Sequence, residues 1–331
     1  MIFLNLMHIF ALCKPISINA AMKKYYFAFV ITALCLGMTG CRSSKNASKS
    51  GSNEVWQTML VKQIDAQVQD QIITVKYNNG TTLCYKILDN FGNVTLTWDR
   101  TNGRKSFDDG PSNYKGDISI PSFIVTGEND EFVFRVMEID QNAFYDCTEV
   151  TSIDIPYSVL RIVNDAFKGC SGVKKFTVNE NNQSYKDVDG VLFSKDNKML
   201  VKYPAKKQLT DYVISEDVSL ICTEAFTDNS YLRKVFVGNF VTAISDFAFR
   251  NCSALEEIEL GGNVRIIGQE AFKNCPKLAL INSHGIFPPH NSPTVFDDAT
   301  KQNAKLYVPR GQMFNYKRRL EWRDFKNVQE Y

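Results

Sequence analysis

The chain has 331 residues, with 44% apolar and 22% charged side chains, which is ordinary for a folded globular protein. The formal net charge is +2, but residues 1–50 contain six basic residues and no acidic one, so the rest of the chain has 32 basic and 36 acidic side chains, a net charge of −4. A mildly acidic body lacks the basic surface of a nucleic-acid-binding protein, so this composition excludes that class of partner.

The first predicted feature is an export signal at residues 22–40. Two lysines follow its methionine, and Tyr25–Met38 is an apolar run too short to span a membrane comfortably. The run leads into Thr-Gly before Cys41 and resembles a bacterial lipobox, whose cysteine is diacylated and becomes the mature N-terminus. The alternative is a simple signal peptide followed by an unrelated cysteine. Residues 1–21 precede this complete signal, so we expect them not to be translated.

Residues 41–54 are rich in Ser, Lys and Asn and have no apolar pattern, which predicts a flexible tether after the lipid. Two acyl chains suffice for stable membrane attachment. We therefore expect an outer-membrane lipoprotein that faces the cell surface, with a periplasmic orientation as the alternative.

Residues 55–135 are predicted to form a β-rich N-terminal cap. Runs of alternating apolar and polar residues indicate short strands at Ile72–Tyr77, Thr82–Ile87, Val94–Trp98, Ile118–Ile120 and Phe132–Val136. Asn79-Gly80, between the first two runs, is a strong hairpin signal. A cap of this kind covers a sheet edge that the stack of repeats after it would otherwise expose.

Residues 136–283 contain five copies of the pattern V-x-x-I-x-x-x-A-F. Their phenylalanines are Phe144, Phe167, Phe226, Phe249 and Phe272. The steps between them are 23, 59, 23 and 23 residues, which predicts an insertion at about 179–212. Within it, residues 190–194 and 199–203 flank a polar turn and predict a hairpin. Phe296 is a degenerate sixth position.

Each copy continues in register after its phenylalanine. The positions nine and eleven residues further on are apolar in most copies, the period-two pattern of a strand with one buried face. One 23-residue unit cannot bury these side chains alone, whereas stacked copies bury them against each other. The pattern predicts a repeat solenoid, mainly β with short helical turns and a parallel sheet. Residues 284–331 form its predicted C-terminal cap, with a strand at Lys305–Val308 and a helix at Gln312–Trp322.

The units resemble the BspA-like leucine-rich repeats of bacterial surface proteins, over roughly residues 70–331. Tyr114–Pro121 and Leu306–Phe325 resemble the segments before the first and after the last repeat of that family. The resemblance implies a non-enzymatic protein-binding role in adhesion to host or matrix proteins or to other cells. The alternative is an accessory lipoprotein that binds a glycan or partner protein in an uptake or envelope assembly.

The sequence offers few residues for catalysis. Outside the leader it contains two histidines, His284 and His290, and no phosphate-binding glycine loop, HExxH or CxxC motif. A Cys275–His284 pair is conceivable, but Cys275 occupies a position that the repeat predicts to be buried. Asp187–Gly190 is similar to the opening of a calcium loop without its remaining ligands. We predict no catalytic residue, cofactor or metal.

Six cysteines follow Cys41. They are Cys84, Cys147, Cys170, Cys222, Cys252 and Cys275. Four of them lie three residues after a repeat phenylalanine, where Asn229 stands in the third copy, and leucine-rich repeats use Asn or Cys there to hydrogen-bond turn backbone. We therefore predict buried free thiols, although an exported protein rich in cysteine often has disulfides.

The candidate binding face consists of side chains that alternate outward on the predicted strands. The residues proposed are Lys175, Thr177, Lys234, Phe236, Glu257 and Glu259. We expect them to form one patch across consecutive strands, because neighbouring strands lie about 4.8 Å apart and solenoids present extended recognition surfaces. The alternatives are a solvated ladder of ion pairs such as Lys234–Glu257, and a site on the insertion or loop edges.

Overall fold

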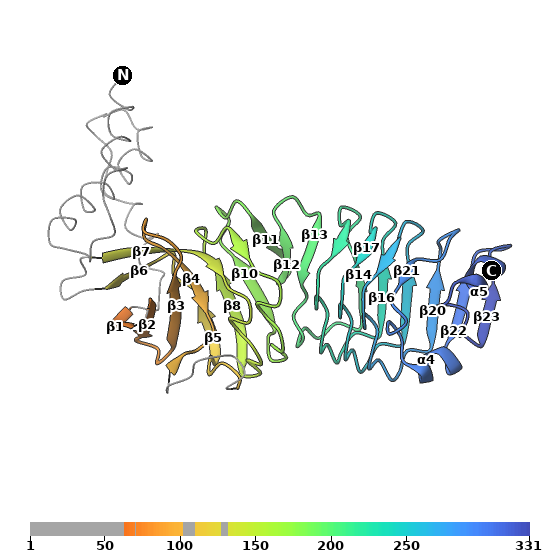
Figure 1. Cartoon of the computed structure of the whole chain (residues 1–331), viewed down its shortest axis with the longest axis horizontal. Helices are drawn as coiled ribbons and strands as arrows, with labels where there is room; N and C mark the ends of the chain where they lie inside the picture. Colours follow the sequence, from red (N-terminus) through yellow and green to blue (C-terminus); the bar gives the residue numbers. More distant parts are fainter. Residues whose placement is uncertain (1–62, 70, 102–109, 127–131) are drawn as a thin grey trace, which may run out of the picture. The chain divides into compact units, whose positions relative to one another are not determined.

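The computed structural model describes residues 63–69, 71–101, 110–126 and 132–331 (Figure 1). Nearly all of them belong to one compact unit, residues 61–124 and 133–331, and the fold below is that of this unit. A second unit comprises residues 1–60 and 125–132. The predicted export signal, Cys41 and the tether lie outside the described residues. No helix in the described ranges is long and apolar enough to cross a membrane.

The N-terminal cap is an antiparallel meander that continues into the repeats. Its strands are β1 (Gln63–Gln69), β2 (Ile72–Tyr77), β3 (Thr82–Ile87) and β4 (Asn93–Thr97). The predicted Asn-Gly turn joins β2 to β3, with Gly80 at a φ of 83° that favours glycine. Strand β4 then pairs in parallel with β7 (Phe132–Ile139), to which β6 (Phe123–Thr126) and β9 (Arg161–Ile162) are also joined.

The repeats stack into three sheets that are largely parallel (Figure 1). A three-stranded sheet contains β5 (Gly116–Ser119), β8 (Val150–Ile155) and β10 (Lys175–Val178). A six-stranded sheet contains β14 (Asp211–Val213), β16 (Lys234–Val237), β18 (Glu257–Leu260), β20 (Leu280–Ser283), β22 (Lys305–Val308) and β23 (Asn327–Glu330). A third sheet contains β13 (Met199–Lys202), β15 (Leu220–Ile221), β17 (Ala243–Ile244), β19 (Ile266–Ile267) and β21 (His290–Asn291), and the strands β11 (Tyr185–Val188) and β12 (Val191–Ser194) extend it. This β-solenoid confirms the predicted fold class.

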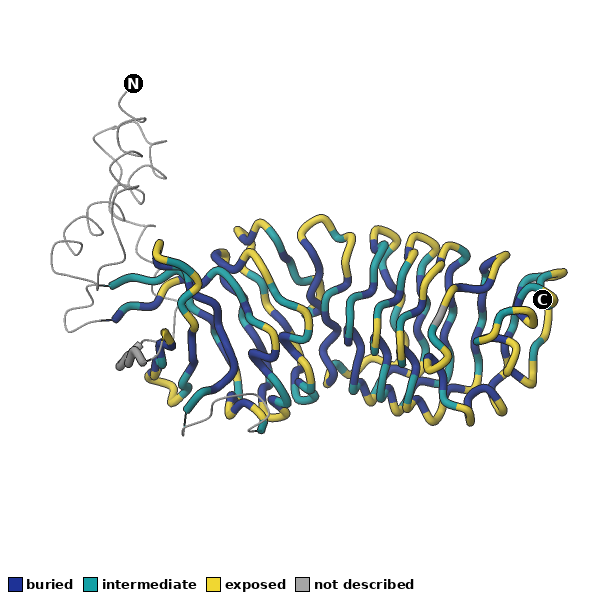
Figure 2. The backbone as a smooth tube through the Cα atoms, in the orientation of Figure 1, coloured by how far each residue is buried: buried dark blue, intermediate teal, exposed yellow. Residues whose placement is uncertain are grey.

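Stacked phenylalanines form the centre of the core. The rings of Phe226, Phe249, Phe272 and Phe296 follow one another with centroids 4.5, 5.1 and 5.3 Å apart and planes within 10° of parallel. Buried segments line the inside of each coil, and exposed residues gather at its turns (Figure 2). Each copy buries its apolar side chains against its neighbours, as the 23-residue period predicts.

The repeat cysteines are free thiols whose Sγ atoms bond to backbone carbonyls. The Sγ atoms of Cys170, Cys252 and Cys275 donate to the carbonyl oxygens of the phenylalanines one copy earlier, at 3.1, 3.2 and 3.1 Å. In the copy that lacks this cysteine, the Asn229 side-chain amide donates to the carbonyl of Ala205 at 3.2 Å. All six described cysteines are free, as predicted. Burial raises the pKa of the Cys252 thiol, which keeps it protonated as a donor.

The 59-residue step contains a repeat that the motif does not reveal. Tyr203 lies 23 residues before Phe226, and its ring stacks on that phenylalanine with centroids 5.0 Å apart. Strands β13 and β14, on either side of Tyr203, pair in parallel with β15 and β16 of the next copy. Much of segment 179–212 is therefore an additional repeat with its own hairpin. The motif missed it because Lys202-Tyr203 replaces the usual Ala-Phe.

The predicted hairpin within this segment is confirmed, since β12 and β13 pair antiparallel. The preceding strand β11 pairs with β12, and together they cover the edge of β10. The amide of Phe176 donates to the Gly190 carbonyl at 2.9 Å, and that of Val178 donates to Asp187 Oδ1 at 2.8 Å. The three-stranded sheet therefore ends at β10, because backbone donors that a further parallel strand would use are already satisfied.

The C-terminal cap follows its prediction in outline. Trp322 and Phe325 are fully buried and place their ring centroids 5.7 and 5.3 Å from that of Phe296. The predicted helix is shorter, α5 (Met313–Arg318), because the chain turns before Trp322 can continue it. A short helix, α4 (Asp298–Asn303), and the edge strand β23 were not predicted.

Candidate binding surface

The six-stranded sheet presents two outward rows of side chains. The register places Lys234 beside Glu257 on the next strand, and Phe236 beside Glu259. All four are partly exposed, so the structure brings together four of the six predicted site residues. The same rows continue into Leu280 and Asn282, and then into Lys305 and Tyr307.

Several of the charges on this face are already paired. Lys234 Nζ lies 3.0 Å from Glu257 Oε1 and 4.7 Å from the centre of the Phe236 ring. The Asn282 amide donates to the same Glu257 oxygen at 3.0 Å. Partly exposed pairs of this kind contribute about 0–1 kcal/mol each. These pairs hold the side chains of the face in place. A partner that replaces them with its own contacts therefore gives up little stabilising energy.

The expectation of one continuous patch is wrong. Lys175 and Thr177 lie on β10, where they neighbour Ser152 and Asp154 of β8. Strand β10 belongs to the three-stranded sheet, and the hairpin on its edge prevents β14 from joining it. The six predicted residues therefore form two separate surfaces.

Three residues at the end of the face were not predicted as part of it. His284 Nε2 lies 3.0 Å from Glu259 Oε1, and its Nδ1 lies 2.6 Å from the Tyr331 hydroxyl. Tyr307 stands in the row of Phe236 and Glu259. The alternation of apolar and polar residues in Lys305–Val308 predicts that Tyr307 points outward with this row. No local sequence pattern predicts that Tyr331 lies beside His284.

The residues considered for catalysis and calcium binding have other partners. The Cys275 thiol bonds the Phe249 carbonyl and is fully buried, so it does not meet His284. Asp187 accepts a backbone hydrogen bond, and Asp189 pairs with Lys207 Nζ at 2.7 Å. The described part of the chain contains no group of three or more side chains suited to hold a metal ion.

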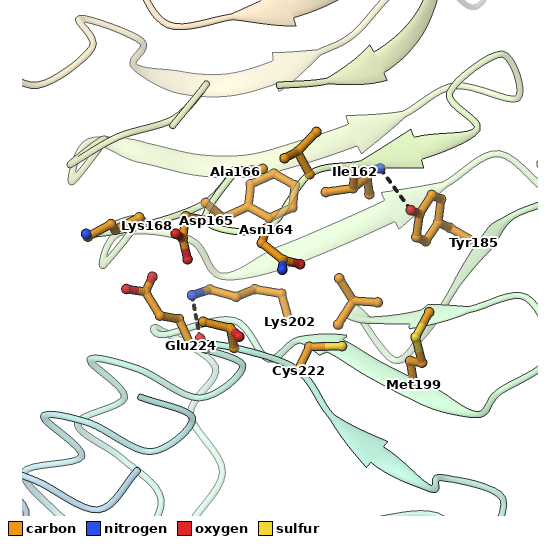
Figure 3. Close-up of a pocket in the computed structure, with 14 residues that line it drawn as sticks. Ile162, Asn164, Asp165, Ala166, Lys168, Tyr185, Met199, Lys202, Cys222 and Glu224 are labelled. Carbon is orange, nitrogen blue, oxygen red and sulfur yellow. Dashed lines mark hydrogen bonds between the residues drawn. The ribbon is translucent and has the colours of Figure 1, made fainter. Parts of the chain in front are cut away.

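A pocket of about 110 Å³ lies beside the Tyr203 repeat (Figure 3). In regular copies the turn before the phenylalanine bonds to the next copy, as when the Glu224 amide donates to the Asp246 carbonyl at 3.1 Å. The Tyr203 repeat passes directly from β13 to its tyrosine and lacks this turn. The Lys202 side chain replaces it, and its Nζ donates to the Glu224 carbonyl at 2.7 Å.

The charges around this pocket are strongly buried. Lys202 is 5% exposed and Glu224 7% exposed, and the Oε2 atom of Glu224 has no hydrogen-bond partner among the described residues. Burial raises the pKa of Glu224, and the nearby Lys202 opposes that shift. Small-molecule sites usually measure about 300–1,000 Å³. We therefore assign this smaller pocket a structural role.

The coils, their asparagine or cysteine ladder and their parallel sheets define a leucine-rich-repeat solenoid. The family model described as a BspA type leucine rich repeat region matches residues 129–197 and 203–287, in six copies. These parts of the chain are therefore similar to leucine-rich repeats of the BspA type. The second match begins at Tyr203, which agrees with its place as a stacked repeat aromatic. No curated protein sequence matches the chain.

Several solved structures resemble the chain in fold. A leucine-rich repeat protein from Eubacterium ventriosum has 17% identity and a TM-score of 0.47 over 81% of this chain and 85% of its own. A leucine rich cell surface protein from Faecalibacterium prausnitzii has 17% identity and a TM-score of 0.43 over 81% and 95%. The pneumococcal vaccine antigen PcpA has 16% identity and a TM-score of 0.39 over 80% and 97%.

Proposed function

We propose that this chain is a non-enzymatic binding protein of the cell envelope, and that a protein partner docks on the outer face of the six-stranded sheet. The observation that carries the proposal is the pair of outward rows, in which Phe236 is partly exposed among charged neighbours that pair only weakly. Binding energy concentrates in few residues, and aromatic side chains surrounded by polar ones are common among them. The inward positions of the same strands maintain the fold, so the outward positions are free to serve recognition.

The proposed setting follows from the lipobox resemblance at Cys41. A diacylated N-terminus holds the protein in the outer membrane at the cell surface, where the solenoid adheres to host or matrix proteins or to other cells. The second candidate is an accessory lipoprotein of an uptake or envelope assembly that binds a glycan or a partner protein. The excess of lysine in residues 168–207, nine lysines against four acidic residues, favours an anionic glycan as its ligand.

The test compares two double variants of the full chain against a partner recovered by pull-down. Phe236→Ala with Glu257→Lys is expected to weaken binding at least about tenfold, since it removes the aromatic and reverses a charge at the centre of the face. Lys175→Ala with Thr177→Ala, on the separate three-stranded sheet, is the matched control and is expected to bind as wild type does. The melting temperatures of both should stay close to that of wild type, because the four side chains are at least partly exposed.

The outcome is measured as an equilibrium dissociation constant for each variant. Wild-type affinity in the Phe236 variant would exclude the six-stranded sheet as the site. A loss confined to the Lys175 variant would move the site to β10.

A further inference from the structure

A second, larger hollow lies on the loop side of the Tyr203 repeat. It has a volume of about 600 Å³, within the usual range of ligand sites. Its lining includes Thr148, Lys174, Lys206, Lys207, Gln208 and Tyr231, which come from four successive copies of the repeat. We call it the lysine groove. It is separate from the outer face of the six-stranded sheet, and its function does not depend on that of the face.

The irregular repeat creates the groove. Lys206 stands three residues after Tyr203, where other copies place the buried cysteine or asparagine, and it is exposed. Backbone hydrogen bonds hold the lysine-bearing segments in place, because the Lys206 amide donates to the Val173 carbonyl and the Lys174 amide to the Thr151 carbonyl, both at 2.8 Å. The lysines are therefore presented from ordered backbone on two adjacent coils.

The charge of this region is opposite to that of the rest of the body. Residues 168–207 contain nine lysines and four acidic residues, a net charge of +5. The remainder of residues 51–331 contains 23 basic and 32 acidic residues, a net charge of −9. No acidic side chain lines the groove, and within the described ranges Lys174 and Lys206 form no ion pair. The third lining lysine, Lys207, is paired with Asp189, so Lys174 and Lys206 supply the positive charge that favours an anionic ligand.

The other lining groups narrow the ligand class. The Lys206 Nζ lies 6.0 Å from the centre of the Tyr231 ring, so a cation and an aromatic face border the same space. Gln208 and Thr148 add an amide and a hydroxyl, which both donate and accept hydrogen bonds. A sugar ring offers an apolar face to an aromatic side chain, hydroxyls to an amide, and carboxylate or sulfate groups to lysines. We infer that the lysine groove binds an anionic saccharide.

The experiment measures binding of defined probes to the full-length protein by calorimetry. The probes are a heparin hexasaccharide, which is sulfated, and a hexagalacturonate, which is carboxylated, with neutral dextran as the blank. We expect at least one anionic probe to bind and dextran not to bind. Lys174→Gln with Lys206→Gln should weaken that binding about tenfold, because it removes two charged hydrogen-bond donors.

A matched control separates the groove from general charge attraction. Lys277→Gln with Lys326→Gln changes the net charge equally at two exposed lysines that lie outside both the groove and the outward rows, and it should bind as wild type does. Tyr231→Ala should also weaken binding, whereas Tyr231→Phe should retain it. The inference is overturned if neither anionic probe binds or if the control variant loses as much affinity as the groove variant. It also fails if a polyglutamate of equal charge binds as tightly and Tyr231→Ala has no effect. None of these results bears on the sheet face, whose test uses different residues.

Discussion

Lys202 illustrates how one side chain replaces a missing piece of backbone. At the position before the stacked aromatic the five copies of the motif have alanine, and Ala143, Ala225, Ala248 and Ala271 are all fully buried. Lys202 is nearly as buried, yet its amine reaches the Glu224 carbonyl, which a turn residue would otherwise bond. Because an unsatisfied buried carbonyl is costly, the lysine stabilises the join between an irregular copy and a regular one.

We predict that Lys202→Met destabilises the protein by about 1–3 kcal/mol, since it leaves the Glu224 carbonyl unsatisfied. The effect should depend on pH. Burial raises the pKa of Glu224, so the folded protein loses stability as the pH rises through that pKa, and removing the lysine raises the pKa further. The deficit in denaturant unfolding should therefore be larger at pH 7 than at pH 4. Lys198→Met, at an exposed lysine of the same hairpin, is the control and should be close to neutral at both.

The stack of aromatic rings is the element that holds the coils together. Phe249 lies between two parallel rings, with centroids 4.5 and 5.1 Å away. Phe296 has one stacked neighbour, but Trp322 and Phe325 cover its other side. The end of the stack is thus closed by aromatic side chains from the cap, although the sequence suggests that Phe296 is a degenerate position.

We therefore predict that Phe249→Ala and Phe296→Ala each reduce the free energy of unfolding by about 3–5 kcal/mol, because both empty a packed core site. Phe240, which is 60% exposed, provides the matched control, and Phe240→Ala should change stability by less than about 0.5 kcal/mol. Chemical denaturation of the three variants measures the difference. A neutral Phe296→Ala variant would mean that the C-terminal cap does not close the stack.

At the scale of the whole molecule, the hydrophobic core, the outward strand faces and the distribution of charge all change at the Tyr203 repeat. The buried apolar residues form two clusters, and both draw on β12, with Leu192 in one cluster and Val191 and Phe193 in the other. The two strand faces on either side of the hairpin are separate, and the excess of lysine is concentrated in the same segment. One irregular copy thus gives this protein two candidate surfaces of different chemistry, one mixed in charge and one basic.

The lipid anchor proposed at Cys41 gives a further prediction. Cys41→Ala is expected to leave the protein without acyl chains and to release it from the membrane fraction, because attachment depends on the two chains. Intact-mass measurement of wild type and variant, together with fractionation, checks this. Protease treatment of intact cells should digest the wild-type protein if it faces outward. A mature N-terminus other than Cys41 would contradict the lipid anchor.

The amino-acid sequence is enough to predict the solenoid, because each copy buries the same kinds of side chain every 23 residues and these apolar positions are periodic in the sequence. The same regularity identified the outward rows of Lys234 and Glu257 and the free thiols of the cysteine ladder. The place of Tyr203 at the head of a further copy, and the separation of Lys175 from Lys234, become visible in the three-dimensional structure. Those features depend on contacts between the hairpin, β10 and a displaced turn, and such nonlocal contacts leave no period in the sequence. The lysine groove has the same origin, since its walls come from four copies whose lysines converge only after the irregular coil is stacked.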